Sequence, residues 1–268
     1  MLLKKPNLSK SLLGELNDYY HPDKQECGLI IRKKYYEKLS TPQSDVQKLG
    51  TYFEYMATGY VRPGDPVPEA EYVYKGTPKQ KLAVDYERAN LSAELYKKII
   101  ATHGIEVTKV GEYMQYEGSS GISDVRAKWN GEDCIIDIKY TSLFDDKWSE
   151  YGWNTERLTE KDNLLLQPLH YKYLMNKLEG IPNIPFYFFI FHSKDAEKVK
   201  IIKVNIDDDR ITYHEQNVVE KMKRYVDMFY NNITLLEARP SYLRCKGCSF
   251  FDTCDKRAEV PLIEEIYY

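Results

Sequence analysis

Hydrophobic positions recur at helical spacing towards both ends of the chain and alternate with polar positions in its middle. The helical spacing predicts six helices, over residues 9–20, 27–39, 44–59, 79–102, 160–178 and 208–231. Alternation with a period of two predicts five strands, over residues 105–118, 121–129, 132–140, 186–192 and 197–206. The segment 61–78 contains four prolines and is expected to be a long connection without regular helix.

A two-residue turn fixes how two of the central strands pair. The tetrapeptide WNGE places Asn130 and Gly131 between two alternating runs, and this dipeptide favours a hairpin because both turn positions need positive φ. Pairing outward from the turn puts Asp124 opposite Asp137 on one face of the sheet, with Lys139 two residues further along that face. The opposite face collects the side chains that we expect in the core: Val125, Ala127, Trp129, Cys134, Ile136 and Ile138.

Two carboxylates forced together need a positive charge between them or a raised pKa. Cross-strand partners have Cβ atoms about 4.5–5.5 Å apart, and like charges placed there destabilise a sheet. Hard divalent ions such as Mg²⁺ and Mn²⁺ favour oxygen ligands, and a neighbouring ammonium can orient water or balance charge on a reacting phosphate. Asp124, Asp137 and Lys139 therefore suit a hydrolytic metal site. The alternative is a structural ion pair between Lys139 and Asp137, with Asp124 turned to solvent.

Composition narrows the class of protein without identifying its partner. The 268 residues, 43% of them hydrophobic, are enough to bury the core of one large domain. The net charge of -3 excludes a strongly basic, histone-like binder, although Lys and Arg can still line one groove. No run of 18 or more apolar residues is present, and the N-terminal residues lack the features of a secretory signal. We therefore expect a cytoplasmic protein without a membrane partner.

The acidic residues and their neighbours resemble the signature of the PD-(D/E)xK nuclease superfamily. The sequence GISD, which ends in Asp124, is followed after twelve intervening residues by DIK, which begins at Asp137. The sequence QPLHY supplies Gln167 and Tyr171, similar to the Gln-x-x-x-Tyr motif of the RecB-like branch, and its spacing of four puts both on one helical face. The sequence GTYFE supplies Glu54 at a place where that branch has an acidic or histidine ligand.

The resemblance implies a fold and a set of roles. The fold would be α/β with a restriction-endonuclease-like core over about residues 44–206, in which helices flank a central mixed sheet containing a three-strand antiparallel meander. The implied catalytic residues are Glu54, Asp124, Asp137, Lys139, Gln167 and Tyr171. The three acids would bind Mg²⁺ or Mn²⁺, and the lysine would position the attacking water or stabilise charge at phosphorus. The glutamine and tyrosine would contact DNA or brace the site.

Three cysteines lie close together near the C-terminus, and a candidate fourth partner lies far from them. The sequence RCKGCSFFDTC contains Cys245, Cys248 and Cys254, and the distant partner is Cys27. Structural zinc sites usually use two local pairs, whereas iron–sulfur clusters often use a local trio with a distant fourth. The arrangement resembles that of AddB-type nucleases and the iron–sulfur nucleases of CRISPR adaptation, which implies a [4Fe-4S] cluster. A disulfide framework is disfavoured, and Cys134 is expected to be a small buried hydrophobe.

The combined prediction is a single nuclease domain over residues 1–268, in which the four cysteines join segment 8–40 to segment 208–257. It would be a metal-dependent DNA exonuclease that hydrolyses phosphodiester bonds of DNA with a free end, in repair, recombination or end processing. No Walker-type phosphate loop is present, so any unwinding would come from a partner helicase. The alternatives are a structure-specific endonuclease, a catalytically silent iron–sulfur DNA-binding subunit and a zinc-stabilised adaptor.

Overall fold

The chain divides into two compact units. The computed structural model describes residues 3–24, 26–74 and 80–260. One unit, here called the sheet unit, consists of residues 43–214, and the other, the terminal unit, combines the chain up to residue 42 with the chain from residue 215 onward. The single nuclease domain expected from the sequence stays a prediction.

A mixed sheet forms the centre of the sheet unit. Its strands there are β4 (Glu106–Tyr116), β5 (Ser119–Trp129), β6 (Glu132–Thr141), β7 (Phe186–His192) and β8 (Val199–Val204). Strand β5 pairs antiparallel with both β4 and β6, whereas β6 pairs parallel with β7, and β7 pairs antiparallel with β8. The predicted α/β fold, with a central mixed sheet that contains a three-strand antiparallel meander, is confirmed.

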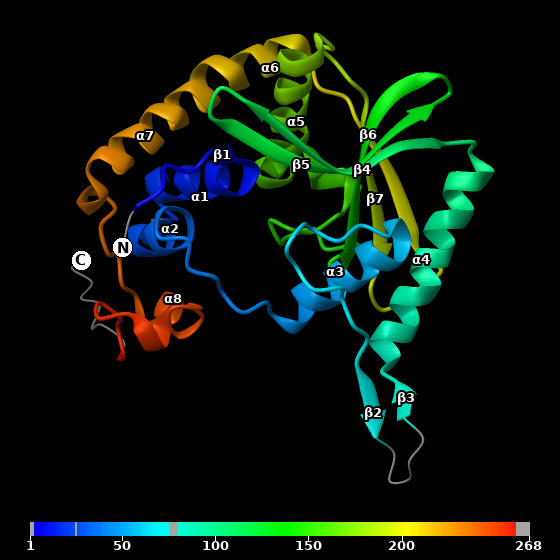
Figure 1. The fold of residues 1–268 in the computed structure, drawn as a ribbon, viewed down its shortest axis with the longest axis horizontal. Coiled ribbons are helices and arrows are strands. Elements are labelled where there is room, and N and C mark those ends of the chain that lie inside the picture. The colour runs from blue at the N-terminus through cyan, green and yellow to red at the C-terminus, as the bar shows by residue number, and fades with distance from the viewer. Residues whose placement is uncertain (1–2, 25, 75–79, 261–268) are drawn as a thin grey trace. The chain divides into compact units, whose positions relative to one another are not determined.

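Helices cover both faces of this sheet. They are α3 (Asp45–Thr58), α4 (Val84–Thr102), α5 (Asp162–Glu179) and the short α6 (Asp208–Tyr213). Side chains of α3 and α4, among them Phe53 and Tyr96, share one hydrophobic cluster with β5, β6 and β7. Helix α5 packs on the other face, where Tyr171 meets Phe186 of β7 with ring centroids 6.2 Å apart. Figure 1 shows α4 and α5 on opposite sides of the strands.

The sequence correctly predicted the central hairpin and the side of it that is buried. Asn130 and Gly131 have φ of 53° and 83°, and Trp129 pairs with Glu132. The apolar face expected from this register does enter the core: Val125, Ala127, Cys134, Ile136 and Ile138 are buried, and Trp129 packs against them.

Two of the boundaries that differ from the prediction in the sheet unit have a clear structural reason. Helix α4 begins at Val84 rather than at residue 79, because Gln80–Leu82 forms a strand, β3, that pairs with β2 (Tyr72–Tyr74). The predicted connection 61–78 therefore contains a strand, and its residues 75–78 lie outside the described residues. Strands β4 and β5 are joined by a tight turn at Glu117 and Gly118, so β5 begins at Ser119 instead of residue 121.

The terminal unit is mainly helical. It contains β1 (Leu8–Ser9), α1 (Lys10–Tyr20), α2 (Gly28–Ile31), α7 (Glu220–Asn231) and α8 (Tyr242–Lys246). The two ends of the chain pack together, since the Tyr36 hydroxyl donates to the Val226 carbonyl oxygen at 3.1 Å and the Tyr20 ring stacks on Tyr225 at 4.2 Å.

Two predicted helices are each divided in the structure. The helix predicted over 27–39 consists of α2 and a π-helical turn, Arg32–Tyr36, and ends at Tyr36 because the chain reaches positive φ at Lys38. The helix predicted over 208–231 consists of α6, a π-helical segment, His214–Val219, and α7. None of the helices in the described ranges has the length and apolar character needed to cross a membrane.

The hairpin turn can be tested with a matched pair of glycines. An added Cβ would meet no atom within 4 Å at either Gly131 or Gly50, but only Gly131 has positive φ. Gly131→Ala should therefore lower the free energy of unfolding by about 1–2 kcal/mol through backbone strain alone. Gly50→Ala, inside helix α3, should raise it by about 0.5–1 kcal/mol. Urea unfolding would measure both, and a neutral Gly131→Ala would contradict the assigned turn.

Candidate active site

The candidate site forms where β6 leaves its antiparallel partner and continues beside β7. The β5–β6 ladder ends at the pair Val125 and Ile136. One position beyond it, the Asp124 carboxylate accepts a hydrogen bond of 2.8 Å from the Ile138 backbone N–H. The sequence predicted that Asp124 and Asp137 would be ladder partners. The ladder ends one position earlier, because the Asp124 side chain accepts the backbone N–H of Ile138. Asp124 also does not turn away to solvent, as the structural alternative required.

Asp137 lies at the centre of the site. Its side chain is fully buried, with one carboxylate oxygen accepting a hydrogen bond from Gln167 Nε2 and the other paired with Lys139 Nζ. The Lys139 side chain keeps 32% of its surface exposed. A buried carboxylate is therefore held between a fixed amide donor and an ammonium that reaches solvent.

The charges of the four ionisable groups influence one another strongly. Burial, and then the negative charge of Asp137, raise the pKa of Asp124 well above its usual value. Burial also raises the pKa of Glu54, against the opposing effect of the Lys139 charge. Burial alone would lower the pKa of Lys139, but the charges of Asp137 and Asp124 raise it overall. The structure therefore gathers Glu54, Asp124, Asp137 and Lys139 into one electrostatic cluster.

Packing in the core brings Glu54 to this cluster. Its neighbour Phe53 stacks on Tyr140, the residue after Lys139, with ring centroids 4.6 Å apart. Helix α3 is fixed in turn by a capping box between Ser44 and Gln47. The sequence did not reveal Arg62, whose positive charge opposes the rise in the pKa of Glu54. A single arginine in a proline-rich segment gives no periodic signal that could have revealed it.

Helix α5 contributes both predicted residues, on one face. The Tyr171 hydroxyl donates a 2.6 Å hydrogen bond to the Ile122 carbonyl oxygen on β5. This close approach requires Gly121, because a Cβ there would lie 2.8 Å from the tyrosine ring. Burial, followed by the negative charges of Asp124 and Asp137, raises the pKa of Tyr171. Tyr171 therefore braces β5 as a neutral hydroxyl, while Gln167 holds Asp137.

The chemistry of the donors fits a hard cation. Within the described ranges, no group of three or more His, Cys, Asp or Glu side chains is placed to hold a metal ion. The acids of the site nevertheless offer carboxylate oxygens, and burial, with neighbouring negative charge, raises the pKa values of Asp124 and Glu54. Such oxygens suit Mg²⁺ or Mn²⁺.

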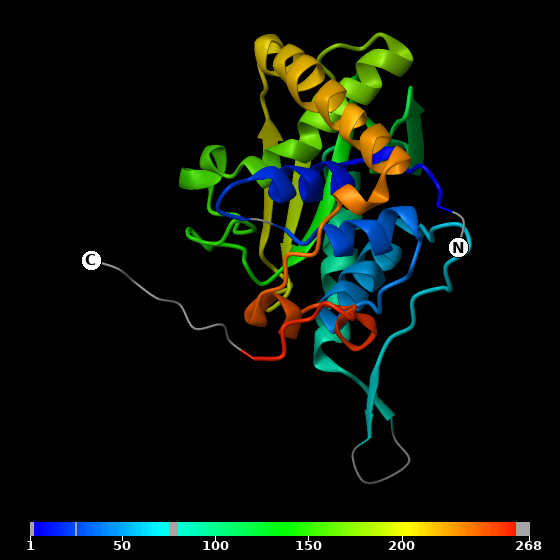
Figure 2. The same cartoon turned by 90° about the vertical axis from the view of Figure 1, so that its left-hand side faces the viewer.

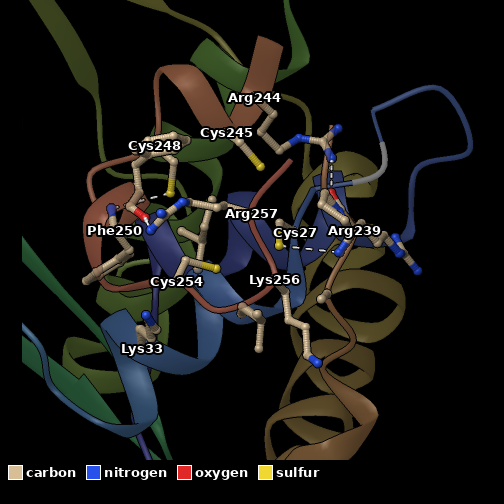
Figure 3. A pocket seen from close by; sticks show the side chains of 15 residues that line it. Cys27, Lys33, Arg239, Arg244, Cys245, Cys248, Phe250, Cys254, Lys256 and Arg257 are labelled. Atoms are coloured by element: carbon tan, nitrogen blue, oxygen red, sulfur yellow. Dashed lines mark hydrogen bonds between the residues drawn. The ribbon is translucent and has the colours of Figure 1, made fainter. Parts of the chain in front are cut away.

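The four predicted cysteines lie together in the terminal unit. Cys27, Cys245, Cys248 and Cys254 line one pocket, where their sulfur atoms turn towards one another (Figure 3), and each is a free thiol. Burial, with smaller contributions from the other three cysteines, raises the pKa of Cys248. Cys134, by contrast, is buried in the core as expected.

A close backbone contact brings Cys27 to the C-terminal cysteines. The Gly28 N–H donates to the Glu237 carbonyl oxygen at 2.9 Å, and an added Cβ at Gly28 would lie 2.6 Å from that oxygen. The Arg239 N–H then points at the Cys27 sulfur, 3.4 Å away. Two further backbone N–H groups, those of Phe250 and Ala258, point at the sulfurs of Cys248 and Cys245.

Basic side chains also line this cysteine pocket: Lys33, Arg239, Arg244, Lys256 and Arg257. Their charged ends bind other groups, since the Arg239 guanidinium donates to the Tyr19 carbonyl oxygen and that of Arg244 to the Lys24 carbonyl oxygen. No three cysteines among the described residues are placed to hold a metal ion. The features that suit thiolate sulfur are therefore the shared pocket and the backbone N–H groups.

Comparison with known proteins bears on the fold. No protein-family model matches the chain, and no curated protein matches it. A proposed exonuclease from Eubacterium rectale superposes on 97% of this chain and 91% of its own, with a TM-score of 0.58 and 16% sequence identity. At this identity the likeness shows a shared fold.

Two further solved structures match less well. A phage-related exonuclease from Haemophilus somnus 129PT covers 86% of this chain and 98% of its own, with 14% identity and a TM-score of 0.43. An alkaline exonuclease from Laribacter hongkongensis covers 58% of this chain and 75% of its own, with 14% identity and a TM-score of 0.37. These TM-scores are too low to support an argument.

Removing the buried negative charge of Asp124 should make the fold more stable. Its pKa is raised in the folded state, so its contribution to stability is present at low pH and lost as pH rises through that value. Asparagine carries no charge and still accepts the bond from Ile138. Without added metal, Asp124→Asn should therefore raise the free energy of unfolding at pH 8 by on the order of 1 kcal/mol, and the gain should shrink on acidification.

Thermal melting in a chelator at several pH values would measure this gain. Asp133→Asn is the matched control, since Asp133 is an exposed acid on the same strand and should show no pH-dependent gain. Destabilisation by Asp124→Asn at every pH would contradict the proposed charge strain.

Proposed function

We propose that this chain is a metal-dependent deoxyribonuclease of the PD-(D/E)xK type that acts as an exonuclease. The observation that carries the proposal is the cluster of Glu54, Asp124, Asp137 and Lys139 at the end of β6. It joins buried carboxylates, which suit divalent ions, to a solvent-reaching ammonium, which can stabilise charge at phosphorus. The fold shared with a proposed exonuclease is consistent with this reading.

The three acids would hold one or two Mg²⁺ or Mn²⁺ ions. A bound divalent ion supplies Lewis-acid polarisation of the scissile phosphate and lowers the pKa of bound water. The chain's own groups do the rest. Lys139, held by Asp137, would balance charge at phosphorus or orient the attacking water, and Gln167 keeps Asp137 in place.

The RecB-like branch and a role in DNA repair, recombination or end processing are part of the same proposal. Gln167 and Tyr171 support it because both lie on one face of α5. Gln167 donates a hydrogen bond to Asp137, and Tyr171 donates one to the Ile122 carbonyl oxygen, two residues before Asp124. DNA with a free end would be the substrate. A helicase or recombination partner would supply any unwinding.

Cleavage of end-labelled linear DNA tests the proposal. Lys139→Ala and Asp137→Asn should each reduce cleavage by about 100-fold or more, because Lys139 would balance charge at phosphorus and Asp137 would hold the metal ion. Single-stranded and double-stranded substrates would be compared with a covalently closed circle in Mg²⁺ or Mn²⁺. Lys128→Ala, at an exposed lysine on β5, is the control and should leave the rate within about twofold.

Each outcome of this assay has a definite meaning. Digestion from the ends that disappears in Lys139→Ala supports the exonuclease. Cutting of the circle replaces it with a structure-specific endonuclease. Wild-type activity in Lys139→Ala overturns the assigned site. If the wild-type chain cleaves no DNA, the alternative of a catalytically silent DNA-binding subunit is favoured.

We also propose that Cys27, Cys245, Cys248 and Cys254 hold a [4Fe-4S] cluster. Support comes from the shared pocket and the backbone N–H groups directed at three of the sulfurs. Cluster binding would contribute folding free energy by cross-linking the two ends of the chain. Its role would be structural.

Metal analysis of protein purified without oxygen tests the cluster. Cys248→Ser should lose the bound iron and sulfide and lower the melting temperature of the terminal unit, because one thiolate ligand is missing. Cys134→Ala removes a thiol of the core instead and should keep both. Stoichiometric zinc in place of iron would establish the zinc-stabilised alternative and overturn the cluster.

A further inference from the structure

The loop between β6 and α5, residues 142–161, packs beside the candidate acids. The Trp153 ring lies edge-on to that of Phe188, with centroids 4.8 Å apart. Phe188 is the register partner of Asp137 on the neighbouring parallel strand, and such partners point to the same face of a sheet. The loop therefore covers the sheet face that carries Asp137. Its backbone is part of the green trace in Figure 2.

Hydrogen bonds hold the first half of this loop in one conformation. Lys161 Nζ donates to the carbonyl oxygens of Asp146 at 3.1 Å and Gly152 at 2.6 Å. The Asp146 carboxylate accepts the N–H groups of Trp148 and Ser149, both at 2.7 Å. An added Cβ at Gly152 would lie 2.2 Å from the backbone carbonyl oxygen of Asp146. The two segments of the loop therefore approach each other too closely for any side chain at residue 152.

The loop is also tied to the edge strand β8. Lys200 Nζ donates to the carbonyl oxygens of Phe144 at 2.7 Å and Trp153 at 3.2 Å. A loop fixed in this way loses little entropy when it binds a partner.

This loop presents two large aromatic side chains to solvent, Trp148 and Tyr151, and Tyr151 is 60% exposed. Trp148 is 83% exposed, whereas Trp153 in the same loop is 3% exposed. The guanidinium of Arg157 lies over one face of the Trp148 ring, 4.9 Å from its centroid. A single exposed apolar residue needs no explanation by itself. For Trp148, a cation backs one ring face, and hydrogen bonds brace the backbone of a loop that packs on the sheet face carrying Asp137.

The acids of the loop are largely compensated by neighbours. Asp145 pairs with Lys200 at 2.5 Å, and Glu156 pairs with Lys147 at 2.8 Å. The Asp146 carboxylate is occupied by two backbone N–H groups. These three acids are thus compensated, and the feature of the loop that suits a flat ligand is the Trp148 ring with a cation on one face.

We propose that Trp148, backed by Arg157 on the loop that covers the sheet face of Asp137, is a stacking platform for an unpaired DNA base. The inference rests on the proposed nuclease function. Every base has a π-face, so an aromatic platform binds single strands with little sequence preference, and an arginine strengthens the contact. In a duplex both faces of an internal base are already stacked. The platform would therefore give the site a preference for single-stranded or frayed ends.

Binding measurements separate this contact from catalysis. Trp148→Ala and Trp148→Phe would each be combined with Lys139→Ala and titrated in Ca²⁺ with a labelled oligothymidylate and a blunt duplex of equal length. Trp148→Ala should weaken binding of the single strand by about 5- to 50-fold, and Trp148→Phe by less than about threefold. Binding of the blunt duplex should change by less than about twofold.

The dependence on salt distinguishes stacking from phosphate contact. Stacking releases no counterions from the phosphates, so the slope of affinity against salt should be the same with and without the Trp148 ring. Tyr213→Ala is the matched control, because Tyr213 is 63% exposed on α6 and should affect neither DNA. Equal loss of single-strand and duplex binding, an altered slope, or no loss at all would overturn the platform.

The platform and the nuclease can fail separately. If the wild-type chain does not cleave DNA but Trp148→Ala still loses single-strand affinity, the proposed function fails and the platform stands. If the chain cleaves DNA and Trp148→Ala binds as well as its parent, only the platform fails. Urea unfolding of each variant confirms that the fold is retained, as expected for an exposed side chain.

Discussion

The carboxylate of Asp137, fully buried at the end of β6, is the constraint to which the surrounding structure conforms. Transfer of an ion from water into a protein costs several kcal/mol of desolvation free energy, which close hydrogen-bond and ion-pair partners must offset. Asp137 receives an amide from α5 and an ammonium from its own strand. A shift of either element would leave a buried charge uncompensated, so the acid fixes both β6 and α5. Asp124 adds a second demand, because it must lie close enough to Ile138 to accept a backbone N–H.

These demands explain why local packing around the site is so specific. Gly121 has no side chain because the Tyr171 ring occupies that space, and Tyr171 in turn holds the Ile122 carbonyl of β5. Phe53 stacks on Tyr140 and thereby sets the position of α3 against the end of β6. Apolar contacts thus place three elements accurately enough for like charges to be held together. Like charges held together cost stability, which is common at active sites and agrees with the proposed function.

The sequence predicted those features that depend on local chemistry. The Asn130-Gly131 turn determined the register of two strands, and from that register followed the buried face and the neighbourhood of Asp124, Asp137 and Lys139. It did not predict where the ladder ends, because that depends on β7, which joins β6 from a distant part of the chain. The start of β5 was misplaced because Ser119, Ser120 and Gly121 do not resemble a strand in composition, although the Glu117-Gly118 turn supports it. The contact of Gly28 with Glu237, which brings Cys27 to the other cysteines, likewise has no local signal.

The two candidate sites differ in donor chemistry, and this difference has a consequence for metal choice. The sheet unit offers carboxylate oxygens, which favour Mg²⁺ and Mn²⁺, whereas the pocket of the terminal unit offers thiols, which favour soft metals and iron–sulfur clusters. Affinity of divalent metals alone generally ranks Mn²⁺ below iron and zinc, so an oxygen site gains selectivity by containing no sulfur or imidazole ligand. Cys134, the cysteine of the sheet unit, faces the core on the opposite side of β6 from Asp137 and accordingly cannot add a soft ligand to the carboxylates. The alternation of side chains along β6 thus keeps this thiol away from the carboxylates.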